Sequence, residues 1–125
     1  MRVKKFKLTP ALKRKLDRLF SAYIHARDNN TCQMCGKTDC KLDTAHIIPR
    51  QCLNLRWNEL NAILLCPYEH KWAAHSFHQN PLVFSQWYSK KYGETQIYHL
   101  LQLSDIPFDS SEANINKIIE SLKII

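Results

Sequence analysis

The first residues whose spacing suggests chemistry are cysteines. Cys32 and Cys35 form a Cys-x-x-Cys pair followed by Gly36, and Cys66 comes about thirty residues later. Structural zinc sites use four cysteine or histidine ligands arranged as a tetrahedron. A Cys-x-x-Cys pair can also be redox-active, but that interpretation expects a thioredoxin-like βαβ pattern, which this sequence lacks. The spacing therefore predicts a structural zinc ion bound by these three cysteines and a fourth ligand.

The sequence leaves the fourth zinc ligand open. Where a second Cys-x-x-Cys pair would end, the chain has Glu69. Cys40 lies close to the first pair and could complete an all-cysteine site, Glu69 could add a carboxylate, and His70 could add an imidazole.

The number of cysteines also bears on the compartment. Five is an odd number, and the charged N-terminus has no apolar run behind it that resembles a signal peptide. No stretch approaches the ~20 consecutive apolar residues of a membrane-spanning helix. We therefore expect a soluble protein without disulfides or a membrane partner, in a reducing compartment such as the cytoplasm.

Histidines are the second group that could do chemistry, because four of the six lie in or next to one segment: His46, His70, His75 and His78. Phosphodiester hydrolysis needs a base that takes a proton from water, a cation that stabilises the developing charge, and a group that orients the base. A neutral imidazole can be the base, a second imidazole can hold the metal, and an amide such as that of Asn61 can orient the base. Each histidine taken singly is more often an ordinary surface or core residue, so this hypothesis depends on the arrangement.

The elements that must position these residues follow from periodicity and helix caps. Thr9-Pro10 begins a helix whose apolar residues recur with a period of 3.6 as far as Ile24. Residues 42–48 and 61–65 are expected to be strands, separated by an irregular loop over 51–59, and Cys66-Pro67 opens a helix. The predicted order is strand, loop, strand, helix.

Three further helices are expected in the C-terminal third. The first begins at Asn80-Pro81 and stops at Gly93, the second covers about residues 94–103, and the third begins near Asp109 or Ser110. Together these elements predict an α+β fold in one domain spanning residues 1–125. Residues 1–27 form a basic helical arm, 28–80 the core, and 81–125 a helical brace without obvious chemistry.

The net charge of +7 is concentrated near the N-terminus. The first helix carries several cations against one acid, Asp17, and those placed off its apolar stripe include Lys13, Arg14 and Arg18. Such a cluster attracts polyanions and can contact phosphates, so a polyanion is the expected partner. The alternatives are a solvated helix face and an acidic membrane surface, but the large apolar counterpart of a membrane anchor is missing.

Short motifs follow one another in order through residues 27–88. They are Arg27-Asp28-Asn29-Asn30-Thr31-Cys32-Gln33-x-Cys35-Gly36, Ala45-His46-Ile47-Ile48-Pro49-Arg50, Leu55-Arg56-Trp57-Asn58, Asn61-Ala62-x-x-Leu65-Cys66, and Glu69-His70 with His75 behind. This series resembles the HNH endonuclease family, especially its phage-type members. The resemblance implies a zinc-braced ββα-metal core and a protein of a prokaryotic or phage-infected cell.

The resemblance also assigns roles. It implies that His46 activates water, that Asn61 positions it, and that His70 binds a catalytic divalent metal, Mg²⁺ or Mn²⁺, with Zn²⁺ or Ni²⁺ as alternatives. In the connecting loop, Arg50 and Arg56 would grip phosphates, and Trp57 would either stack on a base or pack in the core.

The chain departs from the family pattern at Ala45, where many members have Asp or His as a second metal ligand. The metal would then depend on His70 and a partner, for which His75, Asn61 and Asp43 are the candidates. The resulting hypothesis is a metal-dependent DNA endonuclease or nickase. One alternative is a non-catalytic zinc-ribbon DNA-binding protein that kept the fold. Another is a zinc-containing protein-interaction module that docks through its helix over residues 83–92.

Overall fold

Helix α1 (Pro10–Arg27) forms as its cap signal predicts. In the computed structural model, which describes residues 5–123, the Thr9 hydroxyl accepts a hydrogen bond from the Leu12 amide at 3.1 Å. The buried face carries three residues at helical spacing, Leu16, Phe20 and Ile24. Arg2 and Lys4, the first cations of the predicted basic arm, lie outside the described residues.

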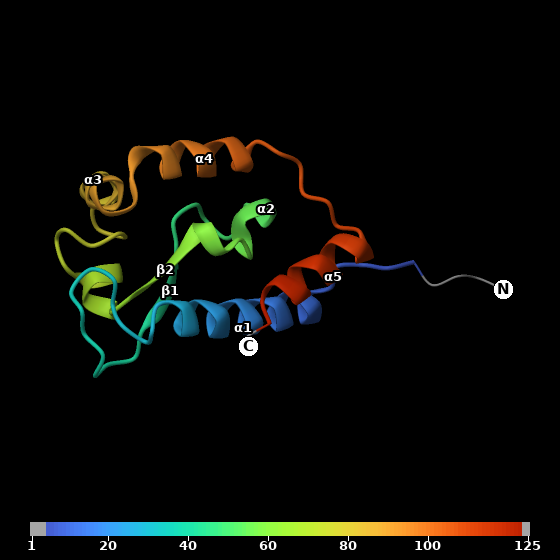
Figure 1. The fold of residues 1–125 in the computed structure, drawn as a ribbon, viewed down its shortest axis with the longest axis horizontal. Coiled ribbons are helices and arrows are strands. Elements are labelled where there is room, and N and C mark those ends of the chain that lie inside the picture. Colours follow the sequence, from blue (N-terminus) through green and yellow to red (C-terminus); the bar gives the residue numbers. More distant parts are fainter. Residues whose placement is uncertain (1–4, 124–125) are drawn as a thin grey trace.

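Two short strands pair antiparallel in the middle of the molecule (Figure 1). Strand β1 (Asp43–His46) pairs with β2 (Ala62–Leu65), with Asp43 opposite Leu65 and His46 opposite Ala62. All four residues of β2 are buried, whereas only Ala45 of β1 is. The fold is therefore α+β, as expected, and both strands are shorter than the predicted ranges.

The loop between the strands is more regular than the sequence indicates. It contains one helical turn, α2 (Leu53–Arg56), and a 3₁₀ turn, η1 (Glu59–Asn61). The Asn54 amide donates to the carbonyl oxygen of Leu103 at 2.7 Å, which ties α2 to a helix far along the chain.

The helix predicted after Cys66-Pro67 is a single π-helical turn, η2 (Tyr68–Trp72). The amide of Ala73 bonds to the carbonyl of Tyr68, five residues back. The carbonyls of Glu69 and His70, which a continuing α-helix would pair with the next turn, instead accept from Phe77 and His78. The chain therefore folds back on this turn, and the helix that Cys66-Pro67 opens is only one turn long.

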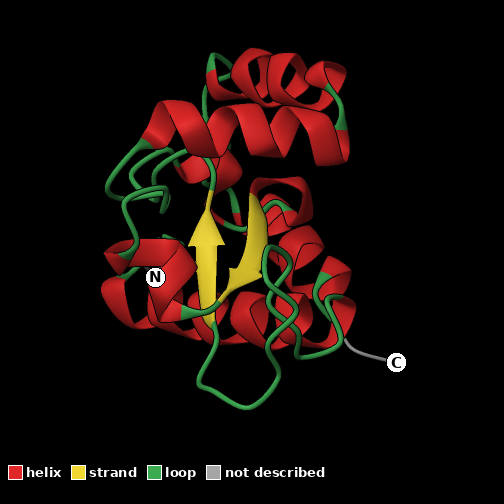
Figure 2. Ribbon diagram, turned by 90° about the vertical axis from the view of Figure 1, so that its left-hand side faces the viewer, coloured by secondary structure: helices red, strands yellow, loops and turns green. Residues whose placement is uncertain are grey.

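The three C-terminal helices are confirmed: α3 (Pro81–Tyr92), α4 (Glu94–Ser104) and α5 (Glu112–Ser121). Gly93 joins the first two at φ 94°, a conformation that favours glycine. Figures 1 and 2 show the strands between α1 on one side and α3 and α4 on the other, with α5 beside α1. Within residues 5–123, no helix is long and apolar enough to cross a membrane.

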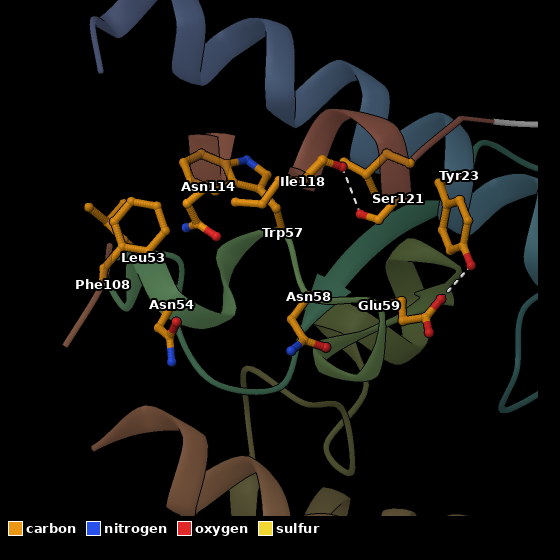
Figure 3. Close-up of a pocket in the computed structure, with 11 residues that line it drawn as sticks. Tyr23, Leu53, Asn54, Trp57, Asn58, Glu59, Phe108, Asn114, Ile118 and Ser121 are labelled. Carbon is orange, nitrogen blue, oxygen red and sulfur yellow. Dashed lines mark hydrogen bonds between the residues drawn. The ribbon is translucent and has the colours of Figure 1, made fainter. Parts of the chain in front are cut away.

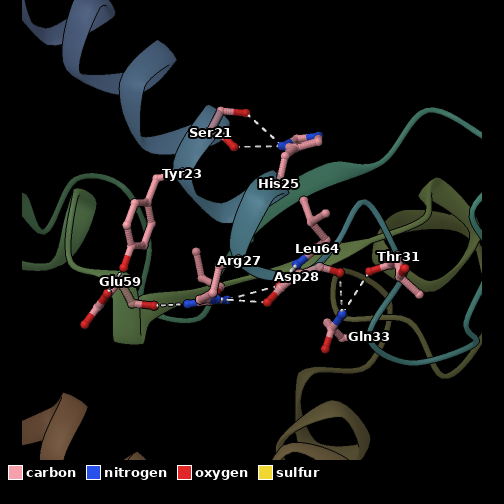
Figure 4. A network of polar contacts seen from close by, with 10 residues as sticks. Ser21, Tyr23, His25, Arg27, Asp28, Thr31, Gln33, Glu59 and Leu64 are labelled. Carbon is pink, nitrogen blue, oxygen red and sulfur yellow. Dashed lines mark hydrogen bonds and ion pairs between the residues drawn. The ribbon is translucent and has the colours of Figure 1, made fainter. Parts of the chain in front are cut away.

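A polar network fixes the end of α1 against the hairpin (Figure 4). Arg27 forms an ion pair with Asp28 and donates to the carbonyl of Ala62 at 2.6 Å. The Asp28 carboxylate accepts from the amide of Leu64 at 3.0 Å, and its backbone carbonyl accepts from Gln33 at 3.3 Å. The Arg27-Asp28 pair therefore joins α1, β2 and the loop that carries the cysteines.

Candidate functional site

Three cysteines form a cluster at the end of the hairpin. Cys32 and Cys35 lie in the turn before β1, Cys66 directly follows β2, and their sulfur atoms all lie within 4.8 Å of one another. The amide of Gln33 donates to the carbonyl of Leu64 at 2.9 Å, which holds the turn against the second strand. Three converging soft donors of this kind could bind a metal ion such as zinc.

Backbone amides point at the sulfur of Cys32. Burial raises the pKa of this thiol, but amides of Cys35, Cys66 and Met34 donate to it and bring the pKa below the ordinary value. Burial and the two neighbouring sulfurs raise the pKa of Cys35 to about 11. The backbone therefore stabilises negative charge on one sulfur of a crowded group, as a thiolate ligand site requires.

No fourth donor joins this cluster among residues 5–123. Cys40 is exposed and lines a separate hollow with Ser21 and His25. The buried carboxylate of Glu69 accepts a hydrogen bond from Nε2 of His75. The composition of the predicted zinc site beyond three cysteines therefore stays a prediction.

His46 is the last residue of β1 and is partly buried. Its Nε2 lies 2.9 Å from the backbone carbonyl oxygen of Arg56. A carbonyl can only accept, so Nε2 carries the proton and Nδ1 has the free lone pair. Burial is the largest influence on His46 and lowers its pKa. The imidazole is therefore held in the neutral form with one defined basic atom.

Asn61 is fully buried and forms three hydrogen bonds with the loop backbone. Its Oδ1 accepts from the amide of Ile48 at 2.8 Å, and its Nδ2 donates to the carbonyls of Ile48 and Leu55 at 3.0 and 3.1 Å. These bonds join Ile48, two residues after His46, to Leu55, the residue before Arg56, so the amide holds the two ends of the loop together. Both ends of the Asn61 amide are therefore occupied by the loop backbone, whereas the family resemblance predicts that this residue positions water.

His70 lies on η2, with 12% of its side chain exposed. Its Nδ1 is 3.0 Å from Oδ2 of Asp43, so a carboxylate holds this nitrogen and Nε2 is the remaining ligand atom. The ring of His78 packs edge-on against it, with 4.5 Å between centroids. Burial, followed by the nearby His70, lowers the pKa of His78.

Of the three candidate partners for His70, only Asp43 contacts it. His75 is bonded to Glu69, and the amide of Asn61 is occupied by backbone groups. His78, one of the four clustered histidines but without a predicted role, is joined to His70 by a hydrogen bond from its amide to the His70 carbonyl at 3.0 Å. Residues eight positions apart are not neighbours within a helical turn, so the periodicity of the sequence does not indicate this contact.

The two proposed catalytic histidines lie on different faces of β1. Alternate strand residues point to opposite sides. His46 packs on α1, with its ring centroid 5.4 Å from that of Phe20, and Thr44 bonds to α1 on the same side. Asp43 faces the other way, where it contacts His70. The structure therefore does not place His46 and His70 in one cluster.

Ala45, where the family resemblance predicts a metal ligand, is completely buried opposite Ile63. A carboxylate at this position would lie in the apolar core, so the substitution of aspartate would carry a desolvation cost.

Arg50 and Arg56, the two arginines expected to bind phosphates, both contact Asp17. Asp17 on α1 accepts two hydrogen bonds from Arg56, at 2.7 and 3.0 Å, one from Arg50 at 2.8 Å, and one from the indole of Trp57 at 2.9 Å. Burial raises the pKa of Asp17, but these partners outweigh burial and lower it. Arg56 and Trp57 therefore fasten the loop to α1, and Trp57, 4% exposed, is a core residue.

Arg50 remains 56% exposed. It lies beside His46, and both residues line a hollow of about 180 Å³ between α1 and β1. The other lining residues are Asp17, Phe20, Ser21 and Thr44. On α1, Arg14 and Arg18 are exposed and Lys13 is half-buried, and none of these three forms an ion pair within the described residues. Positively charged side chains on α1 and at Arg50 are therefore accessible to a phosphate group.

A second, wider cavity lies between α1, α2 and α5 (Figure 3). The indole of Trp57 and the ring of Phe108 form part of its wall, with 6.0 Å between centroids. The amides of Asn54 and Asn114 there donate to backbone carbonyls, and Glu59 accepts from Tyr23. Its polar groups are therefore engaged within the protein, and none of the predicted catalytic or metal-binding residues lines it.

The chain matches no protein-family model, no curated protein and no solved structure.

Proposed function

We propose that this protein is a metal-dependent DNA endonuclease or nickase of the HNH type, which hydrolyses phosphodiester bonds. The observation that carries the proposal is the hydrogen bond from His46 to the carbonyl of Arg56. With Nε2 protonated, Nδ1 can take a proton from an attacking water molecule. The lowered pKa of His46 keeps this atom unprotonated at neutral pH.

The catalytic metal would be held by His70 through Nε2. A histidine whose other nitrogen donates to a carboxylate, as His70 donates to Asp43, is the usual arrangement of a metal-binding imidazole. His78 is the nearest additional nitrogen donor. A bound Mg²⁺ or Mn²⁺ would supply positive charge to the phosphate oxygens as negative charge develops on them.

The choice of DNA as substrate is supported by positive charge beside His46 and on α1. Arg50 lines the same hollow as His46, and α1 contributes Lys13, Arg14 and Arg18. These side chains can bind phosphates without reading the bases. Cys32, Cys35 and Cys66, with a bound zinc ion, would stabilise the hairpin that carries His46.

One observation favours a second candidate, a non-catalytic zinc-containing DNA-binding protein. The base must reach the same phosphate as the metal, yet His46 and the Asp43–His70 pair lie on opposite faces of β1. The buried Ala45 also takes the place of a metal ligand. In this candidate, His46 stabilises the loop through its bond to Arg56 and has no role in chemistry.

Incubation with supercoiled plasmid distinguishes the two functions. The nuclease should convert the plasmid to nicked or linear DNA with magnesium or manganese and not without metal, and His46→Ala should remove this conversion while DNA binding is retained. If wild-type protein binds plasmid, heteroduplex and single strands but cuts none of them with either metal, the binding protein is the correct assignment.

A further inference from the structure

Two aromatic side chains are exposed on η2, on either side of His70 in the sequence. Trp72 has 71% of its surface exposed and Tyr68 52%, whereas Trp57 is only 4% exposed. Aromatic side chains bury a large apolar area when a partner covers them, and this burial is favourable. The exposed indole and phenol therefore form a surface whose burial against a flat apolar partner would be favourable.

Tyr68 and Trp72 are the first and last residues of the same turn. They are four residues apart, and the bond from the Ala73 amide to the Tyr68 carbonyl closes the turn around them. Side chains four residues apart in a helical turn emerge on nearly the same face. Tyr68 and Trp72 can thus contact one extended ligand together.

The surroundings of these rings are positively charged. The Lys37 ammonium lies over the ring of Tyr68, 6.0 Å from its centroid, and Lys71 is exposed between the two aromatic residues. His75 packs edge-on against Tyr68, with 6.1 Å between centroids. The carboxylate of this turn, Glu69, is 7% exposed and bonded to His75, so it presents little negative charge to solvent.

Exposed aromatic rings with cations around them are suited to bind single-stranded nucleic acid. Bases of a single strand stack on aromatic side chains while its phosphates pair with lysines. In a fully paired duplex the faces of the bases are covered by their neighbours. We infer that Lys37, Tyr68, Lys71, Trp72 and His75 form a stacking platform for unpaired bases, so that DNA with a single-stranded segment is the preferred substrate. This inference names the substrate of the proposed nuclease and rests on that function.

The test measures binding without cleavage. In a His46→Ala background, with no added divalent metal, we expect Trp72→Ala to weaken binding of an oligothymidylate by roughly 5- to 150-fold, the loss typical of one stacked base. Binding of a blunt duplex hairpin should change less than about 2-fold, because phosphate contacts remain. Trp72→Phe should retain most of the affinity for the single strand, since a phenyl ring also stacks.

Leu82→Ala is the matched control, because Leu82 is 80% exposed on α3 and should not affect either affinity. Equal weakening of single-strand and duplex binding by Trp72→Ala would overturn the platform. So would an unchanged affinity for the oligothymidylate, or a Trp72-dependent affinity for anionic phospholipid vesicles in place of DNA. A protein that cuts no DNA but shows the Trp72-dependent single-strand preference would refute the nuclease alone.

Discussion

Oδ2 of Asp43 lies 3.0 Å from Nδ1 of His70, which links the first residue of β1 to η2. Asp43→Asn should weaken the affinity for the catalytic metal, or the activity at limiting metal, by about 10- to 100-fold, because the imidazole loses its orienting carboxylate. The measurement is the cleavage rate as a function of magnesium or manganese concentration. Asp39→Asn, which alters an exposed acid on the preceding loop, is the control and should leave the curve unchanged.

His46→Ala should reduce the cleavage rate by roughly 10²–10⁴-fold, the range typical of the loss of a general base. DNA affinity and metal content should stay the same, because His46 contacts neither the cysteine cluster nor the exposed cations of α1. A cleavage rate in this variant close to that of the wild type would assign proton abstraction to another group.

The pH dependence tests the environment of His46. A general base works only when unprotonated, and burial lowers the pKa of His46 from 6.5. Activity should therefore persist to lower pH than for an exposed histidine, with the acid limb of kcat/KM centred below the ordinary value. An acid limb centred above 6.5 would contradict this environment.

Purified protein should contain about one tightly bound zinc ion per chain, and Cys35→Ser should reduce both the zinc content and the melting temperature, because metal binding at such a site stabilises the fold. Cys40→Ser should change neither, since Cys40 lies outside the cluster. Elemental analysis and thermal denaturation provide the readouts. A loss of zinc in Cys40→Ser would return Cys40 to the ligand set.

The contacts of Asp17 predict that substitution of Arg56 and substitution of Arg50 lower the free energy of unfolding by unequal amounts. Arg56→Ala should lower the free energy of unfolding by about 2 kcal/mol, because it removes two charged hydrogen bonds from a carboxylate that is 26% exposed. Arg50→Ala should cost less than about 1 kcal/mol, because Arg50 is largely exposed. Urea denaturation of both variants tests this, and equal costs would contradict the structural role of Arg56.

Neutralisation of Lys13, Arg14 and Arg18 together should weaken DNA binding similarly for all sequences and flatten its salt dependence, as expected for the loss of phosphate contacts. The melting temperature should hardly change, since none of the three forms an ion pair in the described part of the chain. Unchanged binding at low salt would make this helix face a solvated surface and move the DNA path to Arg50.

The sequence by itself determined the elements whose signals are local. Thr9-Pro10 and Asn80-Pro81 mark two helix starts because a side-chain cap and a preset φ act within one turn. The Cys-x-x-Cys spacing likewise predicts the turn that brings Cys32 and Cys35 together, and the strand signals place His46 in the first strand, which ends at this residue in the structure.

Only the tertiary structure decided which partners these residues have. Asp17 bonds to Arg56 and Trp57, which lie about forty positions away in the sequence. Arg56, predicted to contact phosphate, is thereby a structural anchor, and Trp57 takes the second of its two predicted places, the core. The fold-back after η2 exposes Trp72 and brings His78 to His70. Such contacts depend on how the loops close over the hairpin, and local periodicity contains no information about that closure because it reports only neighbours within a turn or a strand.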